Sequence, residues 1–170
     1  IDIEKEIEDS SEWNIDLGKI KLSCRNKKEF LKSLAFSRIL GYLITDGHLS
    51  KKHQSKIYLG HSIDLERLLE DLKLFTEIKQ TKFKSRNLYC VNLPKDFCNI
   101  LHNVRGLAYG KKSTQMSQLP EFILENNCPI PIIREFLGGL FGGDGHTCYL
   151  SKHRNSRDLL TSISFSQTKS

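Results

Sequence analysis

One apolar, glycine-rich segment occurs twice in this chain, 98 residues apart, and each copy ends in Asp-Gly. Residues 39–48 read Ile-Leu-Gly-Tyr-Leu-Ile-Thr-Asp-Gly-His, and residues 137–146 read Leu-Gly-Gly-Leu-Phe-Gly-Gly-Asp-Gly-His. A single Asp-Gly after an apolar helix is usually a turn that ends the helix, but two copies with matching flanks indicate an internal duplication. The chain is therefore expected to contain two copies of one supersecondary unit.

Glycine inside a helix costs roughly 1 kcal/mol relative to alanine, so close packing must offset that cost. Small residues recur at four-residue spacing along one side of each helix: Gly41/Thr45, Gly138/Gly142 and Gly139/Gly143. Two such helices packed side by side would bring Asp46 and Asp144 to the same end. Neighbouring carboxylates repel each other, so this arrangement favours a cation, and Mg²⁺ suits oxygen ligands. A two-metal carboxylate site is a common means of hydrolysing a phosphodiester.

The rest of the chain alternates between helix and strand patterns. Asn26 and Glu29 form a plausible capping pair that opens a helix over 27–45. Further helices are predicted over 65–75, over 96–105 and from Pro131 to the second Asp-Gly. Strands are predicted over 48–54, 56–62, 77–84, 87–93, 147–151 and 160–166. We accordingly divide the chain into a leader (1–26), a first half (27–106), a connector (107–130) and an incomplete second half (131–170).

Charge is distributed unevenly along the chain. Residues 1–16 hold seven acids and one base, so residues 17–170 hold 25 of the 26 Lys and Arg but 13 of the 20 Asp and Glu. A region this basic commonly binds a polyanion, usually nucleic acid. No apolar run is long enough to span a membrane, and the acidic start is unlike a signal peptide. The five cysteines are at least eight positions apart, which disfavours a disulfide framework or a CxxC zinc site and favours an intracellular location.

Both repeated segments resemble the LAGLIDADG motif of the homing endonucleases, also called the dodecapeptide or DOD type. The first copy keeps the motif residues Gly41, Asp46 and Gly47, and the second keeps Leu137, Gly139, Leu140, Asp144 and Gly145. Both depart from the motif at its inner Asp, where Ile44 and Gly142 stand. The stretch 119–123, Leu-Pro-Glu-Phe-Ile, is similar to intein-borne members, and the resemblance covers roughly residues 27–170.

The resemblance implies an α+β fold of two αββαββα halves with pseudo-two-fold symmetry, in which the motif helices pair and the second repeat is truncated here. It implies a site-specific endonuclease that cuts double-stranded DNA in the major groove and leaves 3′ overhangs, in intein or intron homing. Asp46 and Asp144 would be catalytic and would bind Mg²⁺ (or Mn²⁺), with Gly47 and Gly145 in support. Lys95 would be a basic catalytic residue, with an ordinary surface lysine as the equal alternative.

Basic and amide side chains in the predicted strands and turns fit DNA. Lysines would mainly bind phosphates, whereas Arg, Gln and Asn suit base edges. By the resemblance, His61 and Gln167 would lie near the scissile phosphates. His48 and His146 are better suited to DNA contact or plain surface than to metal binding. The other predicted contacts are Lys51, Lys52, Gln54, Lys56, Lys79, Lys82, Lys84, Arg86, Asn87, Lys152, Arg154 and Arg157.

Three functions remain open on the sequence: a DNA endonuclease, an RNA maturase that assists intron splicing, and a non-catalytic DNA-binding protein of the same fold. Retention of both Asp46 and Asp144 favours the first over the third. After Asp144 only 26 residues remain, so a second polypeptide or a missing C-terminal segment would complete the second half. The chain starts with Ile1 and lacks a terminal His-Asn, so it is not by itself a self-splicing intein.

Overall fold

The computed structural model describes residues 2–50, 55–78, 82–85, 88–110, 119–144, 149–152 and 159–162, and it mixes helices with sheet. In chain order the elements are α1 (Ile3–Ser10), β1 (Asn14–Asp16), β2 (Lys21–Ser23), α2 (Lys27–Asp46), β3 (Gly47–His48), β4 (Lys56–Leu59), α3 (Ser62–Lys73), β5 (Lys82–Ser85), β6 (Leu88–Asn92), α4 (Lys95–Leu101), α5 (Glu121–Leu124), α6 (Ile130–Asp144), β7 (Tyr149–Lys152) and β8 (Leu159–Ser162). From α2 to α4 the order is helix, two strands, helix, two strands, helix, as the residue patterns predict.

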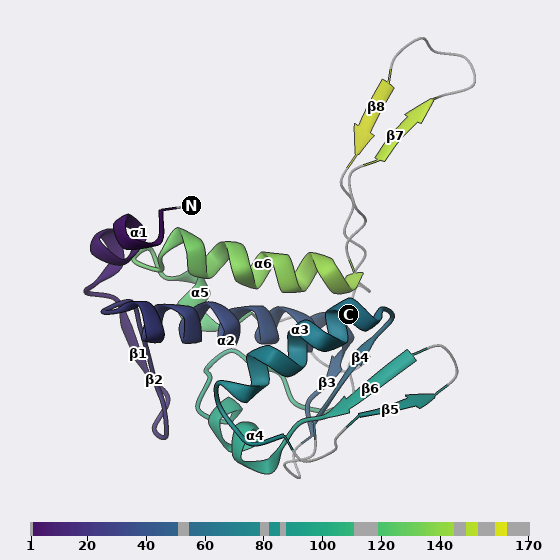
Figure 1. Cartoon of the computed structure of the whole chain (residues 1–170), viewed down its shortest axis with the longest axis horizontal. Coiled ribbons are helices and arrows are strands. Elements are labelled where there is room, and N and C mark those ends of the chain that lie inside the picture. The colour runs from purple at the N-terminus through teal and green to yellow at the C-terminus, as the bar shows by residue number, and fades with distance from the viewer. Residues whose placement is uncertain are drawn as a thin grey trace.

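Helix α2 is the central element, because other elements cover it on several sides (Figure 1). It begins where predicted: the side chain of Asn26 accepts a hydrogen bond of 3.0 Å from the backbone N–H of Glu29. The rings of Phe36, Phe75 and Phe97 pack together with centroid separations between 5.5 and 5.9 Å. This aromatic cluster ties α2 to the end of α3 and to α4.

A four-stranded antiparallel sheet in the order β3-β4-β6-β5 packs beside α2. Ile57 pairs with Val91 and Leu59 with Tyr89, and the first three of these side chains are buried on the face that meets the helices. The alternate residues of β4 and β6 point to the other face, because side chains alternate along a strand. That outer face is the candidate interface described below.

Helices α2 and α6 lie side by side and run in the same direction (Figure 1). A Cβ atom added to Gly41 would lie within 3.0 Å of the backbone of Phe136 and Leu140, and one added to Gly139 would overlap the carbonyl oxygen of Arg38. Gly41 and Gly139 occupy the same place in the 98-residue repeat, and so do residues 38 and 136. The two helices therefore contact each other symmetrically.

The small-residue pattern was only partly right about this contact. Gly139 carries the close approach, but a Cβ on Gly138 would meet nothing within 4 Å. A Cβ on Gly142 would make a milder contact, 3.2 Å from the ring of Tyr42. Adjacent residues of a helix point about 100° apart, so only one of two neighbouring glycines can face the partner helix.

Residues 1–26, expected to be a leader, instead form α1 and the β1–β2 hairpin (Figure 1). Asp2 caps α1 by accepting hydrogen bonds from the backbone N–H groups of Glu4 and Lys5. Trp13 is buried, and its ring lies 6.2 Å from that of Phe122 in α5. The segment therefore belongs to the core, as do buried side chains of the connector that precedes α6.

Candidate nucleic-acid interface

The C-terminal ends of α2 and α6 lie level with each other. The contacting glycines Gly41 and Gly139 each stand five residues before the last residue of their helix, which is Asp46 or Asp144. The structure therefore brings the two backbones together at the predicted place. Asp46 is half-buried, and the side chain of Asp144 lies outside the described residues.

Only glycine fits at residue 47, where α2 ends and β3 begins. A Cβ atom there would lie within 3.0 Å of the carbonyl oxygen of Leu43, so any side chain would force the strand away from the helix. Its φ of −94° is ordinary, which makes the requirement one of space and not of backbone conformation. The second repeat's counterparts, Gly145 and His146, lie outside the described residues.

A row of three polar side chains crosses the outer face of the sheet. His48 pairs with Lys56 on the next strand, and Lys56 pairs with Asn92 on the strand beyond it. Residues directly opposite each other in an antiparallel sheet share a face. His48 and Asn92 are exposed and Lys56 is half-buried, so the row presents hydrogen-bond donors to the surroundings.

Tyr58 extends this polar row along β4. It lies two residues from Lys56, on the same face, and its side chain is 40% exposed. It pairs with Cys90, which shares this face and is buried. We call His48, Lys56, Tyr58 and Asn92 the outer-face set.

A shallow cleft of about 310 Å³ opens beside this set, between the start of β4 and the end of β6. It is lined by Ser55, Lys56, Asn92 and Leu93. The backbone there is fixed, because the N–H of Leu93 donates to the carbonyl oxygen of Ser55 at 2.8 Å. The cleft adds concave shape to the polar row.

Several residues predicted to bind DNA can be placed. Lys56 belongs to the outer-face set, and His61 is exposed at the residue before α3. The backbones of Lys82 and Lys84 pair with Val91 and Tyr89, while their side chains lie outside the described residues. Lys152 is the last residue of β7, with its side chain likewise outside them. Outside the described residues altogether are Lys51, Lys52, Gln54, Lys79, Arg86, Asn87, Arg154, Arg157 and Gln167.

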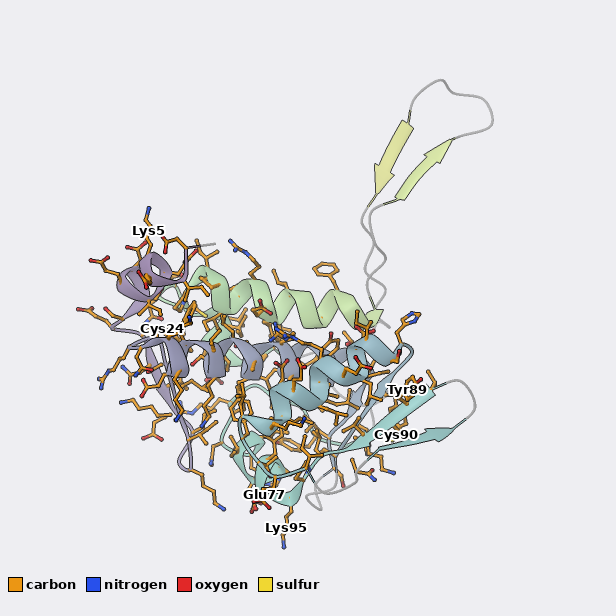
Figure 2. The ribbon with its side chains drawn as sticks, viewed as in Figure 1. Lys5, Cys24, Glu77, Tyr89, Cys90 and Lys95 are labelled. Atoms are coloured by element: carbon orange, nitrogen blue, oxygen red, sulfur yellow. The ribbon has the colours of Figure 1, made fainter. Side chains whose placement is uncertain are left out.

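Lys95 is not brought to the ends of the paired helices. It is the exposed first residue of α4. Figure 2 shows it at the lower edge of the molecule, away from the C-terminal end of α6. The structure therefore gives Lys95 no place beside Asp46, and the surface-lysine interpretation fits.

The cysteines that the structure describes, Cys24, Cys90, Cys98 and Cys128, are free and buried. Burial raises the pKa of Cys24 to about 11 and that of Cys128 to about 12, so both thiols stay neutral near pH 7. Folding keeps these pKa values above the unfolded value, so this contribution to stability falls as the pH rises from about 9 through 11–12. The described residues hold no group of three or more His, Cys, Asp or Glu that could bind a metal.

Within the described part of the chain, no helix is both long enough and apolar enough to cross a membrane.

No family model matches the chain. The chain is similar to "Replication factor C small subunit" of Methanocaldococcus jannaschii, with 33% identity over 138 residues. The match covers 72% of this chain but 7% of that protein, so the chain spans a small part of its relative's length.

This similarity corrects the assignment to the LAGLIDADG homing endonucleases. The relative is named as a replication factor, and no family model supports the motif resemblance. The metal-dependent endonuclease activity, the role in intein or intron homing and the alternatives taken from the same family, an RNA maturase or a non-catalytic member, are corrected with it. The chain is instead similar to part of a replication-factor subunit.

Proposed function

We propose that this chain is a DNA-binding module of a larger, replication-factor-type polypeptide, and that the outer face of its four-stranded sheet lies in the major groove of double-stranded DNA. The observation that carries the proposal is the row His48–Lys56–Asn92, which crosses three strands on an open face. The net positive charge of residues 17–170 and the name of the relative support it.

The dimensions of the row suit the major groove. Neighbouring strands lie about 4.8 Å apart, so the row from His48 to Asn92 is roughly 10 Å across. The major groove is about 12 Å wide and admits a narrow β-ribbon. The amide of Asn92 can pair with an adenine edge, whereas the ammonium group of Lys56 would bind a phosphate.

We also propose that Asp46 and Asp144 hold Mg²⁺ (or Mn²⁺) at the ends of α2 and α6, with Gly47 and Gly145 alongside. The parallel helices place the negative ends of two helix dipoles together, and the last residue of each helix adds a carboxylate. A cation relieves this repulsion, and Mg²⁺ commonly uses one or two carboxylates together with phosphate oxygens. No catalytic step is assigned to this site.

Millimolar Mg²⁺ is therefore expected to raise the Tm of the wild-type chain by a few degrees, because a ligand that binds only the folded state stabilises it. Asp46→Asn and Asp144→Asn should each lose most of that rise, since each removes one charged ligand. Asp9→Asn, in the exposed last turn of α1, is the control and should keep it. Differential scanning fluorimetry measures the shift; an equal rise in all four proteins would rule the site out.

Finally, we propose that α2-β3-β4 and α6-β7-β8 begin two halves of one pseudo-two-fold αββαββα arrangement. The symmetric contact of Gly41 with Gly139 and the equal order of elements support this. A second polypeptide or a further C-terminal segment would then complete the second half.

The outer-face set should control DNA affinity. We expect Lys56→Ala to weaken binding to a duplex of any sequence and to reduce the slope of log K against log salt by about 1, because one phosphate contact is lost. Asn92→Ala should leave that slope unchanged and reduce discrimination between sequences, provided that a preferred duplex has been selected first. Fluorescence anisotropy over a salt series measures both effects.

The matched control is Lys5→Ala, on α1 and far from the sheet in Figure 2. It removes the same charge from the chain but not from the interface. If Lys5→Ala and Lys56→Ala lower the affinity and the salt slope equally, binding follows net charge alone, and the sheet is not the interface.

A further inference from the structure

A second cleft, of about 500 Å³, opens between the end of α1 and the segment that joins α5 to α6. It is lined by residues 8–13, Asn127 and Pro129. Clefts that bind ligands commonly enclose about 300–1,000 Å³. Figure 1 shows α1 at the end of α2 where that helix begins, whereas the four-stranded sheet lies toward its other end. The cleft is therefore separate from the outer-face set.

The lining of this cleft is acidic. Glu8, Asp9 and Glu12 are exposed along it, and no Lys, Arg or His lines it. Their carboxylates form no ion pair in the part of the chain that the structure describes. The last turn of α1 contains Glu8 and Asp9 and no base, although the negative end of a helix dipole favours bases there. A cation bound from outside would relieve this repulsion.

Trp13 also lines the cleft, and it offers a hydrogen-bond donor. Its side chain is 6% exposed and packs against the ring of Phe122. The indole N–H of Trp13 is buried and has no hydrogen-bond partner among the described residues. A buried donor without an acceptor is destabilising, so a ligand that brings an acceptor oxygen into the cleft would be favoured.

The acids and the indole N–H together call for a ligand that carries both positive charge and a carbonyl oxygen. A metal ion does not fit, because the described residues hold no group of three or more His, Cys, Asp or Glu that could bind one. A polyamine has the charge but no carbonyl. A basic peptide has both.

We propose that the cleft binds a Lys- or Arg-rich peptide segment of a partner protein. A backbone carbonyl of that segment accepts a hydrogen bond from the indole N–H of Trp13, and its basic side chains pair with the three acids. The peptide site does not depend on DNA binding by the sheet, which lies toward the other end of α2.

Trp13 is the only tryptophan of the chain, so its fluorescence reports on the cleft directly. A short peptide that alternates Lys with Gly should change the Trp13 emission, and the same peptide with Glu in place of Lys should not. The triple variant Glu8→Gln/Asp9→Asn/Glu12→Gln should bind the Lys peptide about tenfold more weakly, because three exposed ion pairs are lost.

The matched control removes the same charge from exposed acids on or just after α3, as Glu66→Gln/Glu70→Gln/Glu77→Gln. It should bind the Lys peptide as the wild-type chain does.

Trp13→Phe tests the hydrogen bond, because phenylalanine keeps an aromatic ring and removes the N–H. Its affinity for a fluorescein-labelled Lys peptide, measured by anisotropy, should fall about three- to tenfold. Its affinity for spermidine, measured by competition with that peptide, should stay unchanged, because spermidine has no carbonyl to lose contact with. A merely structural effect of the substitution would weaken both ligands.

Equal losses in the two triple variants would overturn the proposal, because binding would then follow net charge alone. Equal weakening of peptide and spermidine by Trp13→Phe would overturn it too, since the indole N–H would not be recognising a carbonyl. So would light scattering that finds the wild-type chain as a dimer that the cleft variant dissociates, because a second copy would then occupy the cleft. DNA affinity plays no part in these measurements.

Discussion

Gly139→Ala is expected to destabilise the chain by about 3 kcal/mol, and Gly138→Ala to stabilise it by up to about 1 kcal/mol. The added Cβ at residue 139 would overlap the carbonyl oxygen of Arg38 and lie 3.1 Å from the backbone nitrogen of Tyr42. Backbone atoms cannot move aside as a flexible side chain can, so the helices must separate, and such overpacking commonly costs 1–3 kcal/mol or more. At residue 138 a Cβ meets nothing, and alanine simply improves helix propensity.

Thermal and urea unfolding of the two variants measure this contrast. One kcal/mol shifts the Tm of a domain this size by roughly 2–4 °C, so the variants should differ by on the order of 10 °C. Gly41→Ala provides a second test, because symmetry predicts a loss like that of Gly139→Ala. If the two glycines of α6 respond alike, the helices do not pack in this register, and the level placement of Asp46 and Asp144 fails with it.

The sequence predicted α2 to within one residue at its end, because both boundaries are local signals. Asn26 caps the start through a hydrogen bond three residues away, and Asp-Gly ends the helix. The leader was misjudged for the opposite reason. An eight-residue helix and two three-residue strands carry too little periodicity to recognise, and the burial of Trp13 depends on Phe122, more than 100 residues away.

The sequence predicted that basic side chains would form the interface, but it did not predict which side chains share one face of the sheet. Lys56 was named because it is basic, whereas Asn92 and Tyr58 were missed. Their outward direction follows from the register of β4 with β6, which pairs Lys56 with Asn92 across a separation of 36 residues. Alternation along each strand was a usable signal, since Ile57 and Val91 mark the inner face. The pairing of the strands was not readable from a single chain.

The family assignment failed at a different step. A short motif fixes a local shape, in this case a glycine-faced helix that ends at a carboxylate, and the structure contains that shape twice. Shape alone does not determine activity, because one fold can carry unrelated functions. The similarity to part of a replication-factor subunit therefore overturns the endonuclease assignment. The helix contact at Gly41 and Gly139 does not depend on that assignment, because it is observed in the structure.

Asp71→Leu is expected to cost about 3–5 kcal/mol, since it leaves the guanidinium group of Arg38 partly unpaired in the interior. Arg38 in α2 donates to both carboxylate oxygens of Asp71 in α3, at 2.7 and 3.0 Å, and to Glu135 in α6. The side chains of Arg38 and Asp71 are only 13% and 5% exposed. Removing one partner of a buried ion pair is strongly destabilising, because desolvation of the remaining charge is no longer compensated.

The double variant Arg38→Met/Asp71→Leu separates pairing from packing. Apolar residues of similar size often replace a buried pair at little cost. The loss of stability in the double variant should therefore be smaller than the summed losses of the two single variants by about 2 kcal/mol or more. Glu70→Ala is the matched control: Glu70 pairs with Arg67 at 3.6 Å with both side chains more than half exposed, so its loss should stay below about 1 kcal/mol. Urea unfolding of the four proteins gives each value. Strict additivity of the single variants would mean that the Arg38–Asp71 pair does not couple α3 to α2, and aromatic packing of Phe36 with Phe75 would then hold the two helices together.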